Sequence, residues 1–407
     1  MTPSSPSRPA LARLTPWVGV FALLAALPAA LASGTRVGFK DAFATARGNA
    51  FVATADNPSA LYYNPAGITQ LDGLQLAGNL YRLAVSSDYT GTGVAASMND
   101  DAQSVPSLYF TWKPAESSWA YGFAVYAPFG LSTEWPDNSP LRTFALKNEQ
   151  TYLTYNFSAA WQVSPSLSLG GSLTYNRVDT DLNRRIGVFS PTDLFRFEGN
   201  GDAIGFNLGV LWAANERHSF GLSYSHPTSV TLKGSSVTAP VLPVESAEAR
   251  FEFPEVLIVG WSFRPTPAWN LEVNLDWTNW NRLNTVTVQK ASGATALPFN
   301  WESGLFYEFG ATRYFTNGWN VSAGYCFTEN STPDSTYTPA VPDSDRHFYS
   351  AGVGYRSHRF TADLAWQYAD GGTRRVTGSP PSLIGATADG SYRNAINAVS
   401  LSLGYKF

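Results

Sequence analysis

The chain has 407 residues, of which 14% are charged and 14% are aromatic, and its formal net charge is −4. Ordinary soluble domains carry about 25% charged residues, so a water-soluble protein of this length would expose more charge. No basic cluster suggests nucleic-acid binding, and the single cysteine, Cys326, excludes an internal disulfide. After residue 32, no apolar run approaches the roughly 20 residues that a membrane-spanning helix needs.

Residues 1–32 have the features of a secretory signal peptide. Arg8 and Arg13 give a basic start, an apolar run follows from Trp17 to Leu31, and small residues flank the expected cleavage point before Ser33. We therefore expect an exported protein, and we exclude residues 1–32 from the fold.

Residues 33–73 do not share the alternation of the rest of the chain. They are rich in alanine and glycine and contain the sequence Asn64-Pro65-Ala66-Gly67. Small side chains allow a short helix or coil to pack against a crowded wall. We predict that this segment lies inside the fold formed by residues 74–407; a periplasmic tail is the alternative.

From residue 74 onward, apolar and polar residues alternate along segments that are separated by turn residues. We expect fourteen strands, at residues 74–90, 104–113, 117–127, 150–163, 166–181, 202–214, 217–231, 249–264, 268–287, 300–315, 318–329, 345–356, 359–370 and 394–407. Strands that are apolar on one face, polar on the other and repeated many times are typical of a sheet closed into a cylinder in lipid. The sequence predicts an all-β fold, a fourteen-stranded antiparallel transmembrane β-barrel.

The connections between these strands fall into two alternating length classes. Every second connection is very short, such as residues 164–165, 316–317 and 357–358. The others are long, at residues 128–149, 181–201, 232–248, 327–344 and 370–393. Short turns on one rim and long loops on the other are the layout of a bacterial outer-membrane barrel. A water-soluble sandwich would also alternate, but it would not sort its loops by length.

Four segments of the mature chain resemble, in order, the FadL/TodX-type outer-membrane transporters of long-chain fatty acids and other hydrophobic compounds. They are Asn64-Pro65-Ala66-Gly67 with Gly38-Phe39 upstream, Pro128 to Glu134, Phe253-Pro254-Glu255 followed by Trp277 and Trp280, and Pro342 to Arg346. Each motif alone is weak, but together they cover the mature chain in register.

The resemblance implies a monomer whose lumen is plugged by an N-terminal hatch containing Asn64, Pro65, Ala66 and Gly67. It also implies that ligand is captured among the extracellular loops and released sideways at a kink in the third strand. Pro128 and Gly130 lie where such a kink would fall, and proline cannot donate a ladder hydrogen bond. Ordinary loop punctuation is the alternative for these two residues.

Two long loops carry apolar clusters that could capture a hydrophobic small molecule. The predicted ligand-binding residues are Ile186, Phe189, Leu194, Phe195 and Phe197 in the first loop and Val241 and Leu242 in the second. Exposed apolar clusters usually mark binding sites. Packing of the loops against each other is the alternative.

A fatty-acid carboxylate would favour a cation near the pocket, ideally arginine. The candidates are Lys147, Arg184, Arg185 and Arg346. Arg184 and Arg185 could instead bind lipopolysaccharide phosphates, and Arg346 could pair with Asp343 or Asp345. Glu302 and Glu308, which we expect to point inward, would disfavour an anion, so a neutral hydrocarbon also fits.

The chain offers little support for catalysis. Its four histidines lack metal-binding spacing, and no G-x-S-x-G motif occurs, so we expect no enzyme activity, no cofactor and no metal. Solvated loop charge explains the acidic clusters at residues 99–101 and 343–345 better than Ca²⁺ binding does. We expect passive, ligand-gated transport of lipophilic molecules; uptake of aromatic or alkane hydrocarbons, a general porin and a barrel lipase are the alternatives.

Overall fold

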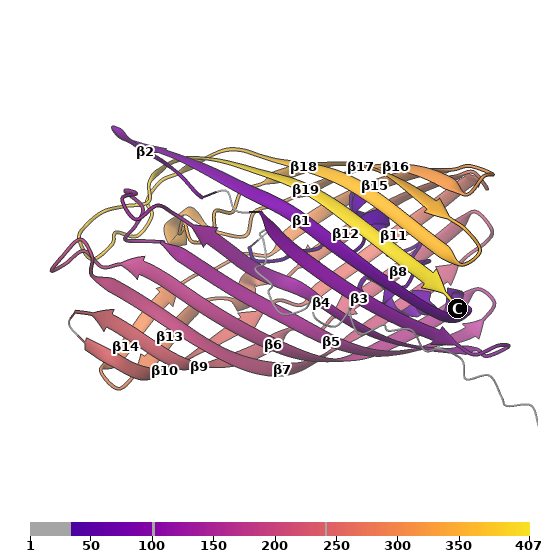
Figure 1. Ribbon diagram of the computed structural model, residues 1–407, viewed down its shortest axis with the longest axis horizontal. Helices are drawn as coiled ribbons and strands as arrows, with labels where there is room; N and C mark the ends of the chain where they lie inside the picture. Colours follow the sequence, from indigo (N-terminus) through magenta and orange to yellow (C-terminus); the bar gives the residue numbers. More distant parts are fainter. Residues whose placement is uncertain (1–33, 100–101, 241) are drawn as a thin grey trace, which may run out of the picture.

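The structure is a computed structural model that describes residues 34–99, 102–240 and 242–407, so the predicted signal peptide, residues 1–32, lies outside the described residues. The described chain forms one elongated antiparallel barrel (Figure 1). Its strands are β1 (Gly73–Gly91), β2 (Val94–Ser97), β3 (Gln103–Lys113), β4 (Trp119–Glu134), β5 (Lys147–Ser164), β6 (Leu167–Arg185), β7 (Leu194–Ala213), β8 (His218–Ser225), β9 (Thr228–Ala239), β10 (Leu242–Phe253), β11 (Val256–Thr266), β12 (Trp269–Thr278), β13 (Thr285–Lys290), β14 (Gly293–Pro298), β15 (Gly304–Tyr314), β16 (Trp319–Thr328), β17 (Arg346–Arg356), β18 (Phe360–Val376) and β19 (Gly390–Lys406).

These segments build fourteen barrel strands, as the alternation predicts. The segments β8 with β9, β10 with β11, β12 with β13, and β14 with β15 are each two halves of one strand, and β2 is a short arm that pairs with β1. Proline occupies two of the breaks, at Pro227 and Pro254, where its missing N–H interrupts the ladder. The barrel closes where β1 pairs with β19, from Gln75 opposite Lys406 to Thr90 opposite Ser391.

The two faces of each strand meet different surroundings. On β19, Val399 and Leu401 are 48% and 44% exposed on the outer face, whereas the inward-facing Ser400 is fully buried. Exposed tryptophans stand near the strand ends on the side of the C-terminus, at Trp112, Trp119, Trp161, Trp212, Trp269 and Trp319. An outer apolar band bordered by aromatic residues is what a lipid bilayer requires of a barrel wall. Among the described residues, no helix is long and apolar enough to cross a membrane.

Several strands extend further than their apolar alternation indicates. The predicted loops at residues 128–149 and 181–201 shrink to residues 135–146 and 186–193, because β4, β5, β6 and β7 continue as paired strands. The predicted loop at residues 232–248 is instead part of a hairpin of β9 and β10. Residues 288–299, which connect two of the predicted strands, form most of the hairpin of β13 and β14. Above the lipid, a ladder needs no apolar face, so the pattern fades before the strand ends.

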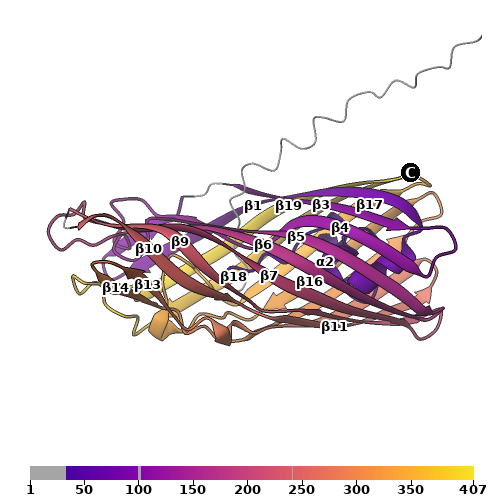
Figure 2. The same cartoon turned by 90° about the horizontal axis from the view of Figure 1, so that it is seen from below.

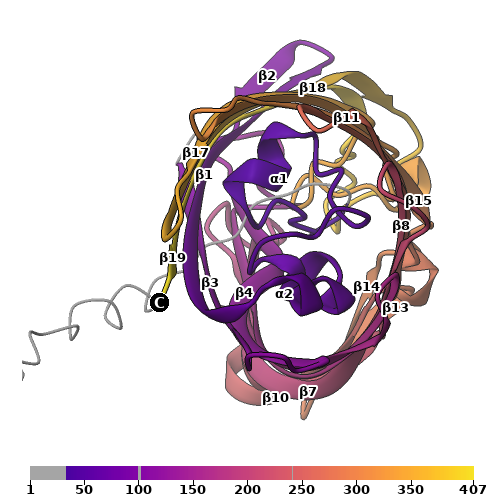
Figure 3. The same ribbon diagram turned by 90° about the vertical axis from the view of Figure 1, so that its right-hand side faces the viewer.

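The N-terminal segment, residues 34–72, lies inside the barrel, as the view along the barrel axis shows (Figure 3). It contains the helices α1 (Ala42–Ala46) and α2 (Ala60–Tyr63) and the 3₁₀ helix η2 (Pro65–Gln70). Glycines in the wall allow the close approach. A Cβ atom at Gly209 would lie 2.3 Å from Asn64 Oδ1, and one at Gly170 would lie 2.3 Å from the Ala66 nitrogen.

Candidate functional site

The wall of the barrel is incompletely paired between β3 and β4. The ladder between these strands joins only Leu108–Trp112 to Tyr121–Val125. The next backbone bond across this seam runs from the Asn99 nitrogen to the Glu134 carbonyl, 2.8 Å away. Residues 104–107 therefore have no β4 partner in the described strand pairing, and a lateral opening in the barrel wall can form there.

The N-terminal segment occupies the free edge of β4 beside this opening. A bulge separates Tyr126 from Phe129 on β4, so Pro128 and Gly130 lie within a bent strand and not in a loop. There the Val37 nitrogen donates to the Pro128 carbonyl at 2.8 Å, and the Gly130 nitrogen donates to the Thr35 carbonyl at 2.7 Å. Residues 35–37 thus take the place of a neighbouring strand on the inner side of β4.

Buried polar groups fix the same segment to the opposite wall. Arg36 binds both oxygens of Asp276 on β12, at 2.7 and 2.6 Å, and Arg47 binds Glu272 on the same strand at 3.2 Å. The Asn49 amide donates to Glu308 on β15 at 2.7 Å. Such pairs are stable only as complete pairs, because a buried charge without its partner is strongly unfavourable.

Asn64 holds the Asn64–Gly67 turn against the barrel wall. Its side-chain oxygen caps η2 by accepting from the Ala66 nitrogen at 3.2 Å. Its side-chain nitrogen donates to the Val52 carbonyl at 2.9 Å and to the Val210 carbonyl on β7 at 3.0 Å. Pro65 occupies the first position of η2, where a missing N–H costs nothing.

The upper cavity lies toward the end of the barrel away from the C-terminus, which is the side of β9, β10, β13 and β14 in Figure 2. It has a volume of 320 Å³, and most of its lining is apolar, including Leu131, Phe195, Phe251, Phe253, Trp280 and Trp301. Its polar lining includes Arg184, Asn148, Gln150, Asn183 and one carboxylate, that of Glu252, which is paired with Ser229 and Arg250. The Arg184 guanidinium lies 5.2 Å over the Phe195 ring, and no carboxylate pairs with it in the described part of the chain.

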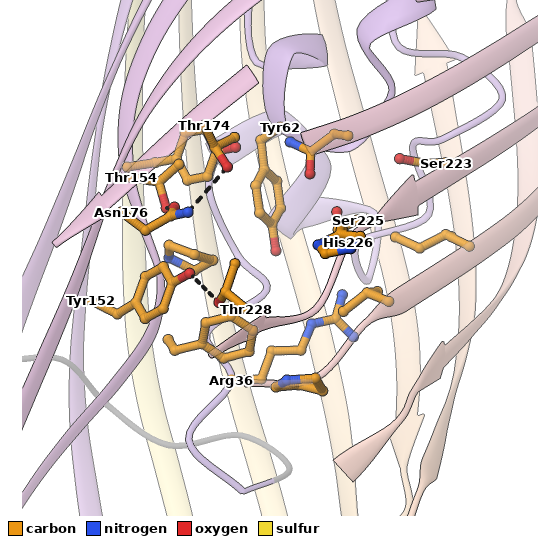
Figure 4. A pocket seen from close by; sticks show the side chains of 17 residues that line it. Arg36, Tyr62, Tyr152, Thr154, Thr174, Asn176, Ser223, Ser225, His226 and Thr228 are labelled. Atoms are coloured by element: carbon orange, nitrogen blue, oxygen red, sulfur yellow. Dashed lines mark hydrogen bonds between the residues drawn. The ribbon is translucent and has the colours of Figure 1, made fainter. Parts of the chain in front are cut away.

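The lower chamber adjoins the N-terminal segment, which contributes part of its lining (Figure 4). It has a volume of 60 Å³ and is lined by Arg36 and Tyr62 of that segment, by the β4 bulge and by hydroxyl and amide side chains of the wall. Four aromatic rings separate the two spaces. Phe129 and Tyr152 line the lower chamber, Phe253 and Trp280 line the upper cavity, and the Phe129 ring lies 5.2, 5.4 and 5.7 Å from the other three.

Several predicted loop residues have positions that differ from the expectation. Phe195 and Phe197 lie on β7 and are buried, because the strand extends past the lipid and turns these two rings inward. Leu194 begins the same strand, and Leu242 begins β10 without lining the upper cavity. Val241 lies outside the described residues.

The exposed apolar surface above the upper cavity involves a different pair of loops from the predicted one. Phe189 is 71% exposed, and its loop, which begins at the half-buried Ile186, packs beside residues 377–389. A Cβ atom at Gly187 would lie 3.4 Å from Ile384, and Leu383 is 78% exposed and lines the upper cavity. Ser379 donates hydrogen bonds to Asp389, which hold the pKa of that carboxyl below its usual range and stabilise this loop.

Of the four predicted cations, Arg184 alone lines the upper cavity. Lys147 is exposed and pairs with Glu149 at 3.1 Å. Arg185 forms a bidentate ion pair with Asp137, and this pair lowers the pKa of the Asp137 carboxyl. Arg346 is buried and pairs with Asp343 at 3.2 Å, while Asp345 accepts hydrogen bonds from Asn330. Glu302 is exposed between β14 and β15, contrary to the inward position expected for it, whereas Glu308 is buried.

The sequence matches the family model described as outer membrane protein transport protein (OMPP1/FadL/TodX) over residues 24–407. The chain belongs to this family. It is therefore an outer-membrane transport protein, and the resemblance seen in its motifs is confirmed.

Individual relatives are distant in sequence but similar in length and fold. A long-chain fatty acid transport protein of Salmonella typhi is 22% identical over 373 residues, covering 81% of this chain and 85% of the relative. The crystal structure of a Pseudomonas aeruginosa FadL homologue has a TM-score of 0.84 at 19% identity, covering 92% of this chain and all of that one. The Pseudomonas putida toluene transporter TodX has a TM-score of 0.71 at 16% identity, covering 92% and 99%. At these identities, the two structures show the fold alone.

Proposed function

We propose that this protein carries long-chain fatty acids or related lipophilic compounds inward through the outer membrane by passive diffusion. The observation that carries the proposal is the upper cavity, which joins an apolar lining to the guanidinium of Arg184. Burial of a hydrocarbon chain gains about 25 cal/mol per Å² of apolar surface. The unpaired guanidinium would bind the carboxylate at the end of such a chain.

The N-terminal segment would act as a ligand-sensitive hatch. Thr35 lines the upper cavity, Arg36 lines the lower chamber, and the intervening backbone is bonded to the β4 edge. A ligand that fills the upper cavity would therefore press on the residues that occupy this edge. Their displacement would open a path to the seam between β3 and β4, from which the ligand could enter the membrane sideways. Since both spaces lie within one closed barrel, we propose that a monomer suffices.

Two other transport functions can be compared with this one. Uptake of aromatic or alkane hydrocarbons is supported by the apolar cavity and by the names of the toluene-transporting structural relatives. A hydrocarbon cargo, however, has no group that would bind the Arg184 guanidinium in the cavity lining. A general porin for polar solutes would need an open aqueous lumen, whereas residues 34–72 fill this one.

Uptake of labelled palmitate by bacteria that express the full chain, in a host without its own transporter, tests the proposal. Replacing Arg184 by leucine should weaken palmitate uptake at low concentration by about tenfold or more, the range expected for hydrogen bonds to a charged group. Arg185→Leu is the matched control, because this neighbouring arginine pairs with Asp137 and does not line the cavity. Equal uptake by Arg184→Leu and the wild type would refute the carboxylate site.

A further inference from the structure

The lipid-facing wall of the barrel carries an apolar groove across β11, β12, β15 and β16, which pair with one another in that order. The groove is open and has a volume of 510 Å³. Its shallowest side chains are Ala311 on β15 and Ala323 on β16, which lie directly opposite each other. Larger outward-facing side chains surround them, including Leu271, Phe309 and Tyr325. The small pair thus leaves a hollow on a wall that otherwise presents large apolar side chains to the membrane.

A cation lies at the end of the groove nearest the C-terminal side of the barrel. Arg313 follows Ala311 by two residues on β15, so both side chains point outward, and it lies opposite Trp269 and Val321. Its guanidinium is 5.3 Å from the centre of the Trp269 ring and 5.9 Å from that of Phe315. No carboxylate among the described residues pairs with it. The two rings hold the guanidinium by cation–π contact and leave its charge available.

The electrostatic setting of the groove favours an anion. The one carboxylate in its lining, that of Glu272, is buried on the inner face of the wall and pairs with Arg47 at 3.2 Å. Short turns face the periplasm in an outer-membrane barrel, and Arg313 lies one residue before the end of β15, beside such a turn. Tryptophans at this end, such as Trp269 and Trp319, mark the level of the lipid head groups. The planar fork of an arginine matches the geometry of a phosphate group.

We propose that this groove is a binding site for an anionic phospholipid of the periplasmic leaflet, such as phosphatidylglycerol. The phosphate would bind Arg313, and one acyl chain would lie in the groove over Ala311 and Ala323. Charge complementarity selects an anionic head group, and the apolar groove continuous with the cation selects a lipid over free phosphate. The site does not depend on the proposed transport function, since β15 and β16 lie across the barrel from β3 and β4 (Figure 3).

The same part of the wall holds the N-terminal segment on its inner side. A Cβ atom at Gly310, which lines the groove, would lie 2.6 Å from the Arg47 carbonyl oxygen. A single layer of strand therefore separates the proposed lipid from the buried Arg47–Glu272 pair. A ligand that binds the folded state and not the unfolded state raises stability. We therefore expect bound phosphatidylglycerol to raise the unfolding temperature of the barrel.

The test is native mass spectrometry of the full chain in detergent, titrated with phosphatidylglycerol or with phosphatidylethanolamine of the same acyl chains. The wild type should bind the first phosphatidylglycerol about fivefold more tightly, the effect expected of one arginine at a membrane surface. Arg313→Leu should abolish this preference. Arg217→Leu is the matched control, because it removes an exposed arginine from the turn between β7 and β8, outside the groove.

A second variant tests the chain-binding part of the site. Ala311→Phe with Ala323→Phe fills the groove with side chains that suit a lipid-facing surface, and should weaken binding of both lipids a few-fold. Phosphatidylglycerol should raise the unfolding temperature of the wild type and of Arg217→Leu by more than that of Arg313→Leu.

Four results would overturn the lipid site. They are equal binding of the two lipids by the wild type, an equal loss of preference in Arg217→Leu and Arg313→Leu, competition by inorganic phosphate at the concentration of the lipid, and a dimer that carries no lipid. The last result would assign the groove to a second copy of the chain. Palmitate uptake is measured separately, so that a failure of the lipid site and a failure of the proposed function remain distinguishable.

Discussion

The N-terminal segment is held very differently on its two sides. Toward β12 and β15 it is fixed by buried charged groups, with Arg36 on Asp276, Arg47 on Glu272 and Asn49 on Glu308. Toward β4 it is held by backbone bonds at residues 35–37 beside a bulged strand. A complete buried pair is costly to separate, whereas single backbone bonds are worth about 1 kcal/mol each. The contrast indicates a fixed side and a releasable side.

Breaking the fixed side should have the largest effect. Asp276→Asn leaves the Arg36 guanidinium buried without its counter-charge and should lower the free energy of unfolding by about 3–5 kcal/mol. The measurement is the denaturant midpoint of the refolded barrel in detergent.

The double variant Arg36→Met with Asp276→Leu separates charge from packing. It removes both partners and should recover most of the lost stability, since replacing a whole buried pair by apolar groups is often neutral. If Asp276→Asn has the midpoint of the wild type, the segment is not fixed through this pair.

A smaller effect is expected where the segment meets β7. Asn64→Ala with Pro65→Ala removes the bonds from the Asn64 amide to the Val52 and Val210 carbonyls, a loss of about 1 kcal/mol for each bond. The turn should then shift, and residues 35–37 should no longer align with β4, so uptake of labelled palmitate should fall.

The same segment provides a matched control for this change. Asn57 and Pro58 form a second Asn-Pro pair, and Asn57 bonds only within the segment, to Asp41 and Ser59. Asn57→Ala with Pro58→Ala should therefore leave uptake near that of the wild type. Normal uptake by a folded, membrane-inserted Asn64→Ala, Pro65→Ala variant would rule out the hatch role of this turn.

The sequence predicts the barrel better than it predicts the site. Alternation such as Val399 and Leu401 against Ser400 is imposed by lipid on one side and a polar interior on the other, so it is visible in the chain itself. Beyond the lipid this constraint ends, and Phe195 and Phe197 therefore looked like loop residues although they are inward-facing strand residues.

Contacts across the barrel could also not be predicted from the sequence. The Tyr152–Thr228 bond and the Arg36–Asp276 pair join residues far apart in the chain, and no local pattern marks such partners. The choice of Arg184 among four cations likewise depends on which of the others find a carboxylate. Pro128 was a usable local signal, because a proline inside a strand indicates a break in pairing.

The smallest expected effect concerns the outer loops, where we propose that ligand first meets the protein. Phe189→Glu places a charge on the exposed apolar surface formed with Leu383 and Ile384, and should weaken palmitate uptake at low concentration a few-fold without affecting stability. Phe195→Glu would not test capture, since it buries a charge in the wall of the upper cavity. Val94→Glu, at the exposed tip of the β1–β2 arm, is the matched control. Equal uptake by Phe189→Glu and Val94→Glu would show that cargo reaches the upper cavity by another route, and the release at β4 would then have to be triggered from inside the cavity alone.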